Sequence, residues 1–495
     1  MGGNVAPSLH HGDHADAPCV ARCHHDREGS RPMRDQRAEV SLHIAPHETI
    51  EGRVIEPRAF RILVVGDFSA RADASATATP RRVDRDDLDD HLARIAPRLR
   101  VTIDDAPIDL AFTSMDDFLP DRLVARMSSL DRAAPSGSPT PAAISPPMGV
   151  ESHAPDPGRI VSGASLLDDM LADVSEAPVR PTRRTDELSA FVERAVTPHL
   201  VHAPDAETSA RAATEHEATT RRIRRVLHEP RVQSLEATWR ALDLLVRRLD
   251  TDGDLALFLF DAARDDVAAA LERLARERDA SGDDQWALVI SLHQFPEGEA
   301  GAEALARIAM AARALDAPFV AGAPASFADE ATAPPEVFTL IRQSLEARFL
   351  GLTFPRVLLR TPYGRDNPAD TIEFEELEDP ERHEDYLWGS GAVLVALLVG
   401  EAFNERGWAI GPRMSLDVGS LPLFMYKRGP ETVAMSCAET TMSERVARHL
   451  LSRGLMPLAW IKNTDRVRLV ELRSVADPAA PLAASWTSLA PGRDA

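Results

Sequence analysis

The sequence predicts an α/β protein with a mostly parallel sheet flanked by helices, preceded by a small α+β domain and a disordered N-terminal tail. Two observations support this fold class. Between residues 236 and 321, short apolar runs alternate with segments of helical periodicity, which is typical of β-α-β units. An earlier apolar run, Phe60–Val65, begins a strand, helix, hairpin and helix pattern that ends before a Pro/Ser/Gly-rich stretch.

At 495 residues the chain is longer than one ordinary core, so we expect several folded units. Two terminal segments and one internal segment lack apolar periodicity. They cannot bury enough apolar surface to offset the entropy of an ordered chain, so we expect two disordered tails and a linker. Composition divides the chain into a His/Cys-containing tail (1–57), a first domain (58–131), a Pro/Ser/Gly linker (132–162), a helical segment (163–230), a large core (231–478) and a second disordered tail (479–495).

The N-terminal tail carries side chains that in principle bind zinc, although their spacing is not that of a standard zinc finger. One interpretation is a disordered extension, or an over-extended start of translation with Met33 as an alternative first residue. The other is a site with metal affinity, which chelator-sensitive zinc in the purified protein would reveal. The candidate ligands are His10, His11, His14, Cys19, Cys23, His24 and His25.

The first domain should begin with the buried strand Phe60–Val65, which ends in a turn at Gly66-Asp67. A helix is expected over Val83–Ala96, because acidic residues favour its N-terminus and apolar residues then recur on one face. The remaining elements are two alternating strands, Leu99–Ile103 and Ile108–Phe112, and a closing helix, Asp117–Met127.

Helical segments at Asp186–Val196 and Glu215–Leu227 precede the large core, which should open with a helix over Glu236–Val246 that buries Trp239. Beyond residue 348 the pattern is less regular. The elements expected in this region are the strands Leu255–Phe260, Trp286–Leu292 and Phe319–Ala321, the helices Asp265–Arg276, Glu303–Leu315 and Ala392–Phe403, and a strand-like end at Val467–Leu472.

Composition excludes several classes of partner and location. The formal net charge of −22 argues against nucleic acid, because binding a polyanion requires a basic face. Three cysteines are too few for a secreted disulfide framework. The apolar run Ala392–Val399 is too short to span a bilayer, and the N-terminus lacks a signal-peptide pattern. We therefore expect a cytoplasmic protein without direct membrane insertion.

The folded regions carry no residue pattern typical of an enzyme, so we predict no catalytic, cofactor-binding or metal site there. Gly66-Asp67 lacks the second glycine and the Lys-Ser or Lys-Thr of a phosphate loop. His383-Glu384-Asp385 are adjacent and point in different directions, unlike zinc histidines at i and i+4. Cys437 has no histidine nearby in sequence and is expected to be a small buried residue.

Aromatic residues make up only 5% of the chain, so the positions of those that occur are informative. Trp239 lies at helical spacing with leucines and is expected in a core. Tyr386 and Trp388 precede an apolar helix, where they would anchor either a core or an interface. The sequence alone leaves both alternatives open.

Several ordered motifs resemble the sheath proteins of bacterial type VI secretion. Phe60-Arg-Ile-Leu-Val-Val-Gly-Asp-Phe-Ser69, followed by Arg82-Val-Asp-Arg-Asp-Asp-Leu-Asp-Asp90, is similar to the small sheath subunit. Most of residues 163 to 470 resembles the large sheath subunit. The motifs that carry this second resemblance are Arg348-Phe-Leu-Gly-Leu-Thr-Phe-Pro-Arg-Val-Leu-Leu-Arg-Thr-Pro-Tyr-Gly364, His383-Glu-Asp-Tyr-Leu-Trp-Gly389, Gly454-Leu-Met-Pro-Leu458 and Lys462-Asn-Thr-Asp465.

The resemblance implies a sheath-type, non-enzymatic subunit in which the two partners are fused. Such subunits assemble with other sheath-type subunits into a hollow helical tube around rings of an inner-tube protein. Baseplate components and an AAA+ unfoldase are further implied partners. The helix that the unfoldase recognises would contain Leu166, Leu167, Met170 and Leu171; alternatively, these residues form an amphipathic helix docked on its own domain.

One departure from the family lies near the C-terminus. The family's large subunit continues past its Lys-Asn-Thr-Asp motif into strands that pair with neighbouring subunits, whereas this chain stops at Ala495. We therefore expect a C-terminally shortened subunit that lacks the usual interlocking strands. The alternative function is a non-polymerising adaptor or baseplate-associated module that has kept the sheath-type fold.

Overall fold

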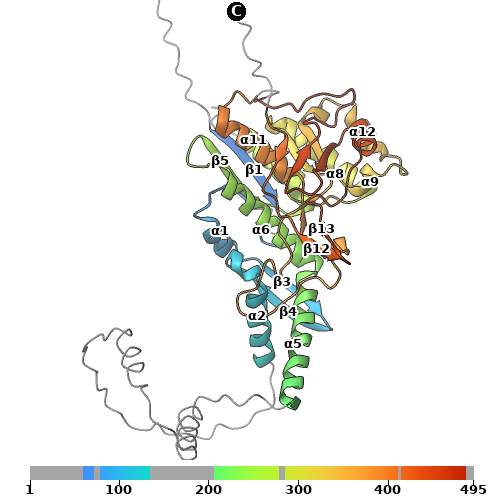
Figure 1. Ribbon diagram of the computed structural model, residues 1–495. Coiled ribbons are helices and arrows are strands. Elements are labelled where there is room, and N and C mark those ends of the chain that lie inside the picture. Colours follow the sequence, from blue (N-terminus) through green and yellow to red (C-terminus); the bar gives the residue numbers. More distant parts are fainter. Residues whose placement is uncertain (1–58, 72–77, 134–205, 278–284, 411–413, 487–495) are drawn as a thin grey trace, which may run out of the picture. The chain divides into compact units, whose positions relative to one another are not determined.

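The computed structural model describes residues 59–71, 78–133, 206–277, 285–410 and 414–486 (Figure 1). We call the described residues up to 133 the N-terminal segment and those from 206 the C-terminal segment. Both contribute to one nine-stranded sheet with the order β11-β15-β14-β8-β7-β6-β1-β5-β2. Its strands are β1 (Phe60–Gly66), β2 (Arg81–Val83), β5 (Leu255–Asp261), β6 (Leu288–Ser291), β7 (Phe319–Gly322), β8 (Leu350–Phe354), β11 (Asp417–Val418), β14 (Met456–Trp460) and β15 (Val467–Leu469).

The sheet is mixed and mostly parallel, which confirms the predicted fold class. The six neighbouring strands from β14 to β5 run parallel. The strands β2, β15 and β11 at the two edges run antiparallel to their neighbours. Parallel strands need helical crossovers that cover both faces, so their side chains are buried on both sides.

Helices cover the two faces of the sheet and form two separate cores. Alternate side chains of β1 point to opposite faces: Ile62 and Val64 join one core, and Leu63 and Val65 join the other. The first core contains α6 (Pro230–Arg248) and α11 (Ala392–Arg406). The second contains α7 (Val267–Glu277), α8 (Gly298–Leu315), α10 (Glu336–Arg342) and α12 (Glu444–Ser452).

Local sequence explains the two helices of the first core. The Glu229 carboxylate caps α6 by accepting the backbone N–H groups of Arg231 and Val232, and Pro230 occupies the first turn. Trp239 is fully buried on this helix, as the sequence predicted. Eleven residues of α11 are buried on all sides, which agrees with its nearly uninterrupted apolar sequence.

The N-terminal segment shows the predicted order of strand, helix, hairpin and helix. After β1 come α1 (Leu88–Ile95), the antiparallel hairpin β3 (Arg98–Ile103) and β4 (Ala106–Ala111), and α2 (Pro120–Ala133). The predicted helix start at Val83 was wrong. Residues 81–83 pair with β5 as the edge strand β2, where the open hydrogen-bonding edge outweighs helical propensity.

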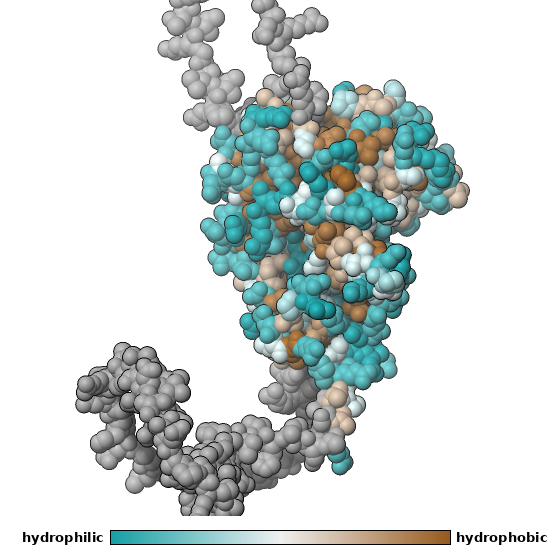
Figure 2. Space-filling model, viewed as in Figure 1, coloured by the Kyte–Doolittle hydropathy of each residue, from teal (hydrophilic) through white to brown (hydrophobic). Residues whose placement is uncertain are grey.

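The rest of the C-terminal segment contains shorter elements. The helix α5 (Ala206–Leu227) precedes α6, and α9 (Ala325–Ala328) follows β7. Two further antiparallel pairs are β9 (Val357–Leu358) with β10 (Trp388–Gly389), and β12 (Met425–Arg428) with β13 (Glu431–Ala434). On the face in Figure 2, hydrophilic residues predominate, and smaller apolar patches lie between them.

The prediction of a disordered tail from residue 479 was wrong for residues 479–486. Leu482 and Trp486 are buried in the first core, and the Trp486 indole N–H donates to the Ala287 carbonyl at 2.9 Å. The backbone N–H of Ala483 donates to the Arg348 carbonyl at 2.7 Å. The stretch is rich in Pro and Ala, but it also contains Leu482 and Trp486. Burial of these two large apolar side chains favours packing of the stretch against the sheet.

We expect Gly301→Ala to destabilise the fold by about 1 to 3 kcal/mol, the usual cost of overpacking. A Cβ at Gly301, in α8, would lie 1.8 Å from the carbonyl oxygen of Pro296, so backbone must move. Urea unfolding measures the change. Gly253→Ala is the matched control, because no atom lies within 4 Å of a Cβ there. Equal stability of the two variants would contradict the close approach of α8 to Pro296.

Candidate functional site

The N-terminal segment contributes a central strand to the sheet of the C-terminal segment. β1 pairs with β5 along its whole length, from Phe60 opposite Leu255 to Gly66 opposite Asp261 (Figure 1). On its other side, residues 62–65 pair with β6. The four residues from Ile62 to Val65 are fully buried. The two segments therefore share the cores on both faces of the sheet, and we call the region where β1 pairs with β5 and β6 the joint.

Side chains outside the sheet extend the joint. The Trp239 indole N–H donates to the Phe68 carbonyl at 3.1 Å, and the two rings meet edge to face with centroids 5.1 Å apart. Asp121, in α2, accepts the backbone N–H groups of Asp370 and Thr371 at 2.7 and 2.9 Å. These contacts fix α2 and the end of β1 to the C-terminal segment.

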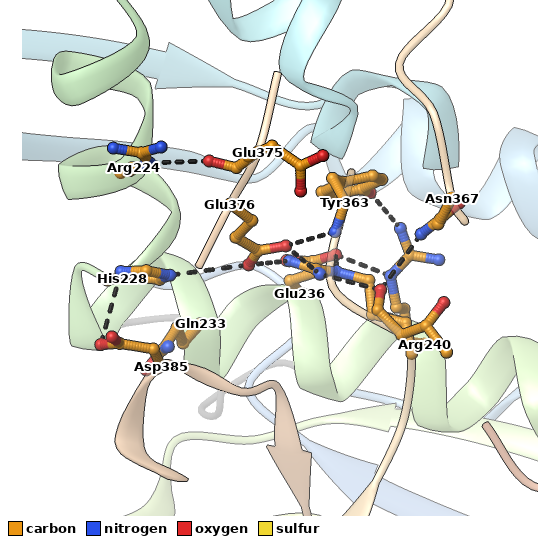
Figure 3. Close-up of polar contacts among 12 residues, drawn as sticks. Arg224, His228, Gln233, Glu236, Arg240, Tyr363, Asn367, Glu375, Glu376 and Asp385 are labelled. Carbon is orange, nitrogen blue, oxygen red and sulfur yellow. Dashed lines mark hydrogen bonds and ion pairs between the residues drawn. The ribbon is translucent and has the colours of Figure 1, made fainter. Parts of the chain in front are cut away.

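Next to the joint, a buried arginine links two buried carboxylates, those of Glu236 and Glu376, which are labelled in Figure 3. Arg360 donates to Glu236 of α6 at 2.7 Å and to Glu376 at 2.7 and 3.0 Å. The exposed fraction of all three side chains is 7% or less. Arg240 also donates to Glu236 at 2.7 Å and to the Tyr363 hydroxyl at 2.8 Å. The network ties α6 to the loop between β9 and β10.

The network is electrostatically balanced around Glu376. Burial alone would raise the pKa of this carboxyl, but Arg360 and hydrogen bonds, including the backbone N–H of Tyr363 at 2.7 Å, lower it to about 2. The same carboxylates hold the pKa of Arg360 above its ordinary value despite burial. His228, at the end of α5, lies 3.7 Å from Glu376 and 3.5 Å from Asp385. The charges of Arg360, Glu236 and Glu376 are therefore paired within the chain.

The turn after β1 does not offer its amides to a ligand. Asp261 Oδ1 accepts the backbone N–H groups of Phe68 and Ser69 at 2.9 and 3.1 Å. Burial raises the pKa of both Asp67 and Asp261, and repulsion by Asp261 raises that of Asp67 further. The turn at Gly66-Asp67 therefore closes on a protein carboxylate where a phosphate loop would hold phosphate.

The other residues considered for chemistry show no catalytic arrangement in the described part of the chain. Cys437 is buried, its thiol donates to the Pro422 carbonyl at 3.1 Å, and burial raises its pKa to about 12. His383 is exposed and pairs with Glu384 at 3.2 Å. Among the described residues, no three His, Cys, Asp or Glu side chains are grouped to hold a metal.

Tyr386 and Trp388 lie in a small core of this chain with Leu358. Their exposed fractions are 2% and 6%, and both polar atoms are satisfied within the chain. The Tyr386 hydroxyl donates to Pro380 O at 2.7 Å, and the Trp388 indole to His383 O at 2.6 Å. The candidate unfoldase-binding residues, Leu166, Leu167, Met170 and Leu171, and the candidate tail ligands lie outside the described residues.

His293 should make the stability of the fold depend on pH. Burial lowers its pKa from 6.5 to about 4, and its ring nitrogen Nε2 lies 2.9 Å from Ala262 O. The unfolded chain therefore takes up a proton between pH 6.5 and 4 that the folded chain does not. This contribution is fully present above pH 6.5, and about 2 kcal/mol of it is lost at pH 5. Urea unfolding at pH 8 and pH 5 should show a smaller difference for His293→Gln than for the unchanged protein. An identical difference in the two proteins would contradict this assignment.

Two family models match the two segments that meet in the joint. The model described as "Type VI secretion system, VipA, VC_A0107 or Hcp2" matches residues 32–133. The model described as "EvpB/VC_A0108, tail sheath N-terminal domain" matches residues 213–476, more than half of the chain. The chain belongs to the type VI secretion tail sheath family. It combines a segment of the small sheath family with one of the large sheath family.

A curated relative agrees with this assignment. The "Type VI secretion system sheath protein TssC1" of Pseudomonas aeruginosa is 26% identical over 296 residues, which cover 52% of this chain. The match spans 59% of the length of that relative. Within the described residues of this sheath-family chain, no helix is both long and apolar enough to cross a membrane.

The charged network of this sheath-family chain was not predicted from the sequence. Arg360 lies inside a motif that pointed to the family, but nothing in the motif marked it as buried. One signal was available for Glu236. It lies four residues after Val232 and three before Trp239, so it shares the apolar face of its helix. A carboxylate on a buried face requires a partner, which here is arginine.

Proposed function

We propose that the chain is a structural sheath subunit in which one polypeptide takes the place of a small and large subunit pair. The observation that supports this most directly is β1 of the small-subunit-like segment, which lies between β5 and β6 of the large-subunit-like segment. Fusion fixes the stoichiometry at one to one. It also makes the pairing intramolecular, which raises the effective concentration of the two parts.

In this proposal the subunit assembles with further sheath-type subunits around rings of the inner-tube protein, on a baseplate. Contraction of the sheath would deliver effectors by releasing the energy of a metastable lattice, without nucleotide hydrolysis by the subunit. The setting would be the cytoplasm. The paired charges and the occupied turn amides of the joint support a mechanical role.

Negative-stain electron microscopy tests the assembly. We expect hollow helical tubes from the purified protein, alone or co-expressed with its genomic neighbours. Dispersed small particles under both conditions would overturn the proposal and favour the non-polymerising adaptor or baseplate-associated module. Circular dichroism of the same sample shows whether dispersed particles are folded, which separates an adaptor from a preparation that failed to fold.

We further propose that an AAA+ unfoldase recognises the segment containing Leu166, Leu167, Met170 and Leu171, as the family resemblance suggests. Replacing Leu167 with aspartate should then abolish binding of the unfoldase in a pull-down, because the apolar face of an amphipathic helix carries the contact. Unchanged binding by Leu167→Asp, with Leu345→Asp as an exposed control, would contradict this role.

A further inference from the structure

A cavity of about 240 Å³ opens at the joint, at the ends of β1 and β5. Both segments line it. Because the volume is below the roughly 300 to 1,000 Å³ of sites for drug-sized ligands, the cavity suits a small ion or group. Its described lining includes Ser69, Arg71, Arg81, Arg94, Leu259 and Asp261.

Three arginines from three different elements converge on this cavity. Arg71 follows β1, Arg81 lies on β2 and Arg94 lies in the last turn of α1. Among the described lining residues, Asp261 supplies the only carboxylate. Its Oδ1 already accepts two backbone N–H groups of the turn after β1. The lining thus carries more positive than negative charge, although the whole chain has a net charge of −22.

The Asp261 carboxylate interacts electrostatically with Arg71 without forming an ion pair, so within the described chain it neutralises the three guanidinium groups only in part. Arg71 donates to the carbonyl of Ile95 at 2.5 Å, and Arg94 lies 3.3 Å from the ring nitrogen Nδ1 of His91. Neither of them, nor Arg81, forms an ion pair with another described residue. The positive charges around the cavity repel each other. An anion bound among them would offset this repulsion and lower the free energy of the folded protein.

We propose that this cavity binds a tetrahedral phosphate-type anion, either inorganic phosphate or the phosphate group of a small phosphomonoester. Arginine remains charged at all physiological pH values, and its planar donors match phosphate oxygens in pairs. The contacts come from arginine side chains, since the turn amides are occupied by Asp261. An anion held between Arg81 and Arg94 would also brace β2 against α1 and stabilise the joint.

Isothermal titration of the full chain with inorganic phosphate, at ionic strength held constant with potassium chloride, tests this site. We expect saturable binding at one site and a phosphate-dependent rise in the melting temperature. Arg81→Gln and Arg94→Gln should each weaken binding about tenfold or more. Arg85→Gln should leave binding unchanged, because Arg85 is exposed in the turn between β2 and α1 and does not line the cavity.

Glycerol phosphate in place of inorganic phosphate distinguishes the two sources of the anion. Tighter binding of the ester would assign the site to a phosphomonoester, and equal or weaker binding to the free ion. Unfolding midpoints without phosphate show whether the variants fold like the unchanged protein. The proposal is overturned by non-saturable binding, by equal binding of acetate, or by an equal effect of Arg85→Gln. None of these measurements depends on tube formation, so failure of the phosphate proposal can be distinguished from failure of the sheath proposal.

Discussion

Replacing Arg360 with methionine is expected to destabilise the fold by about 3 to 5 kcal/mol, the cost of leaving buried charges without a partner. Glu236 and Glu376 are almost fully buried, and Arg360 donates to both. Methionine fills a similar volume but provides no donor. Equilibrium unfolding in urea, followed by circular dichroism, measures the loss.

Two further variants separate charge from packing at this position. Adding Glu236→Gln and Glu376→Gln to Arg360→Met should recover much of the loss, because neutral amides are cheaper to bury than carboxylates. Arg445→Met removes an arginine that pairs with Glu330 at the surface, so its unfolding midpoint should stay unchanged. If the triple variant were no more stable than Arg360→Met alone, lost packing of the guanidinium would account for the destabilisation, and unpaired charge would not.

Many regular elements of this chain could be predicted from the sequence, because a buried face requires apolar residues at the spacing of a helix or a strand. The strands β5, β6 and β7 and the helices α7 and α8 were placed within a few residues of their observed bounds. Their apolar runs and stripes are local features. The strands β8 and β14 were not predicted, since β8 contains Gly351 and β14 contains Pro457, which weaken the strand pattern.

The joint could not be predicted in the same way, because strand order depends on contacts between distant residues. β1 reads as an ordinary buried strand, and nothing in its seven residues specifies neighbours that begin at residues 255 and 288. The family resemblance named the two parts but not their pairing. The burial of Arg360 could not be predicted either, because a single charged residue in a loop belongs to no periodic pattern of apolar residues.

Replacing Val64 with aspartate should prevent the sheet from forming, because it places a carboxylate at the centre of a strand with neighbours on both sides. Val64 is fully buried, opposite Leu259 of β5 and Ile290 of β6. An unpaired charge in such a position costs several kcal/mol, on the order of the 5 to 15 kcal/mol that stabilises a whole domain. We expect the variant to appear in the insoluble fraction.

Graded variants show whether the cost arises at the joint. Val64→Ala should lose about 2 kcal/mol, as expected for a truncated core side chain, and should remain soluble. Thr102→Asp, on the exposed face of the strand β3, introduces the same charge where water can solvate it, so solubility should be retained. A soluble, equally stable Val64→Asp protein would mean that β1 does not lie between β5 and β6. Loss of β1 leaves the edges of those two strands open, and unpaired strand edges promote aggregation. Because β1 of the small-subunit-like segment lies between β5 and β6, its loss would divide the sheet of the large-subunit-like segment.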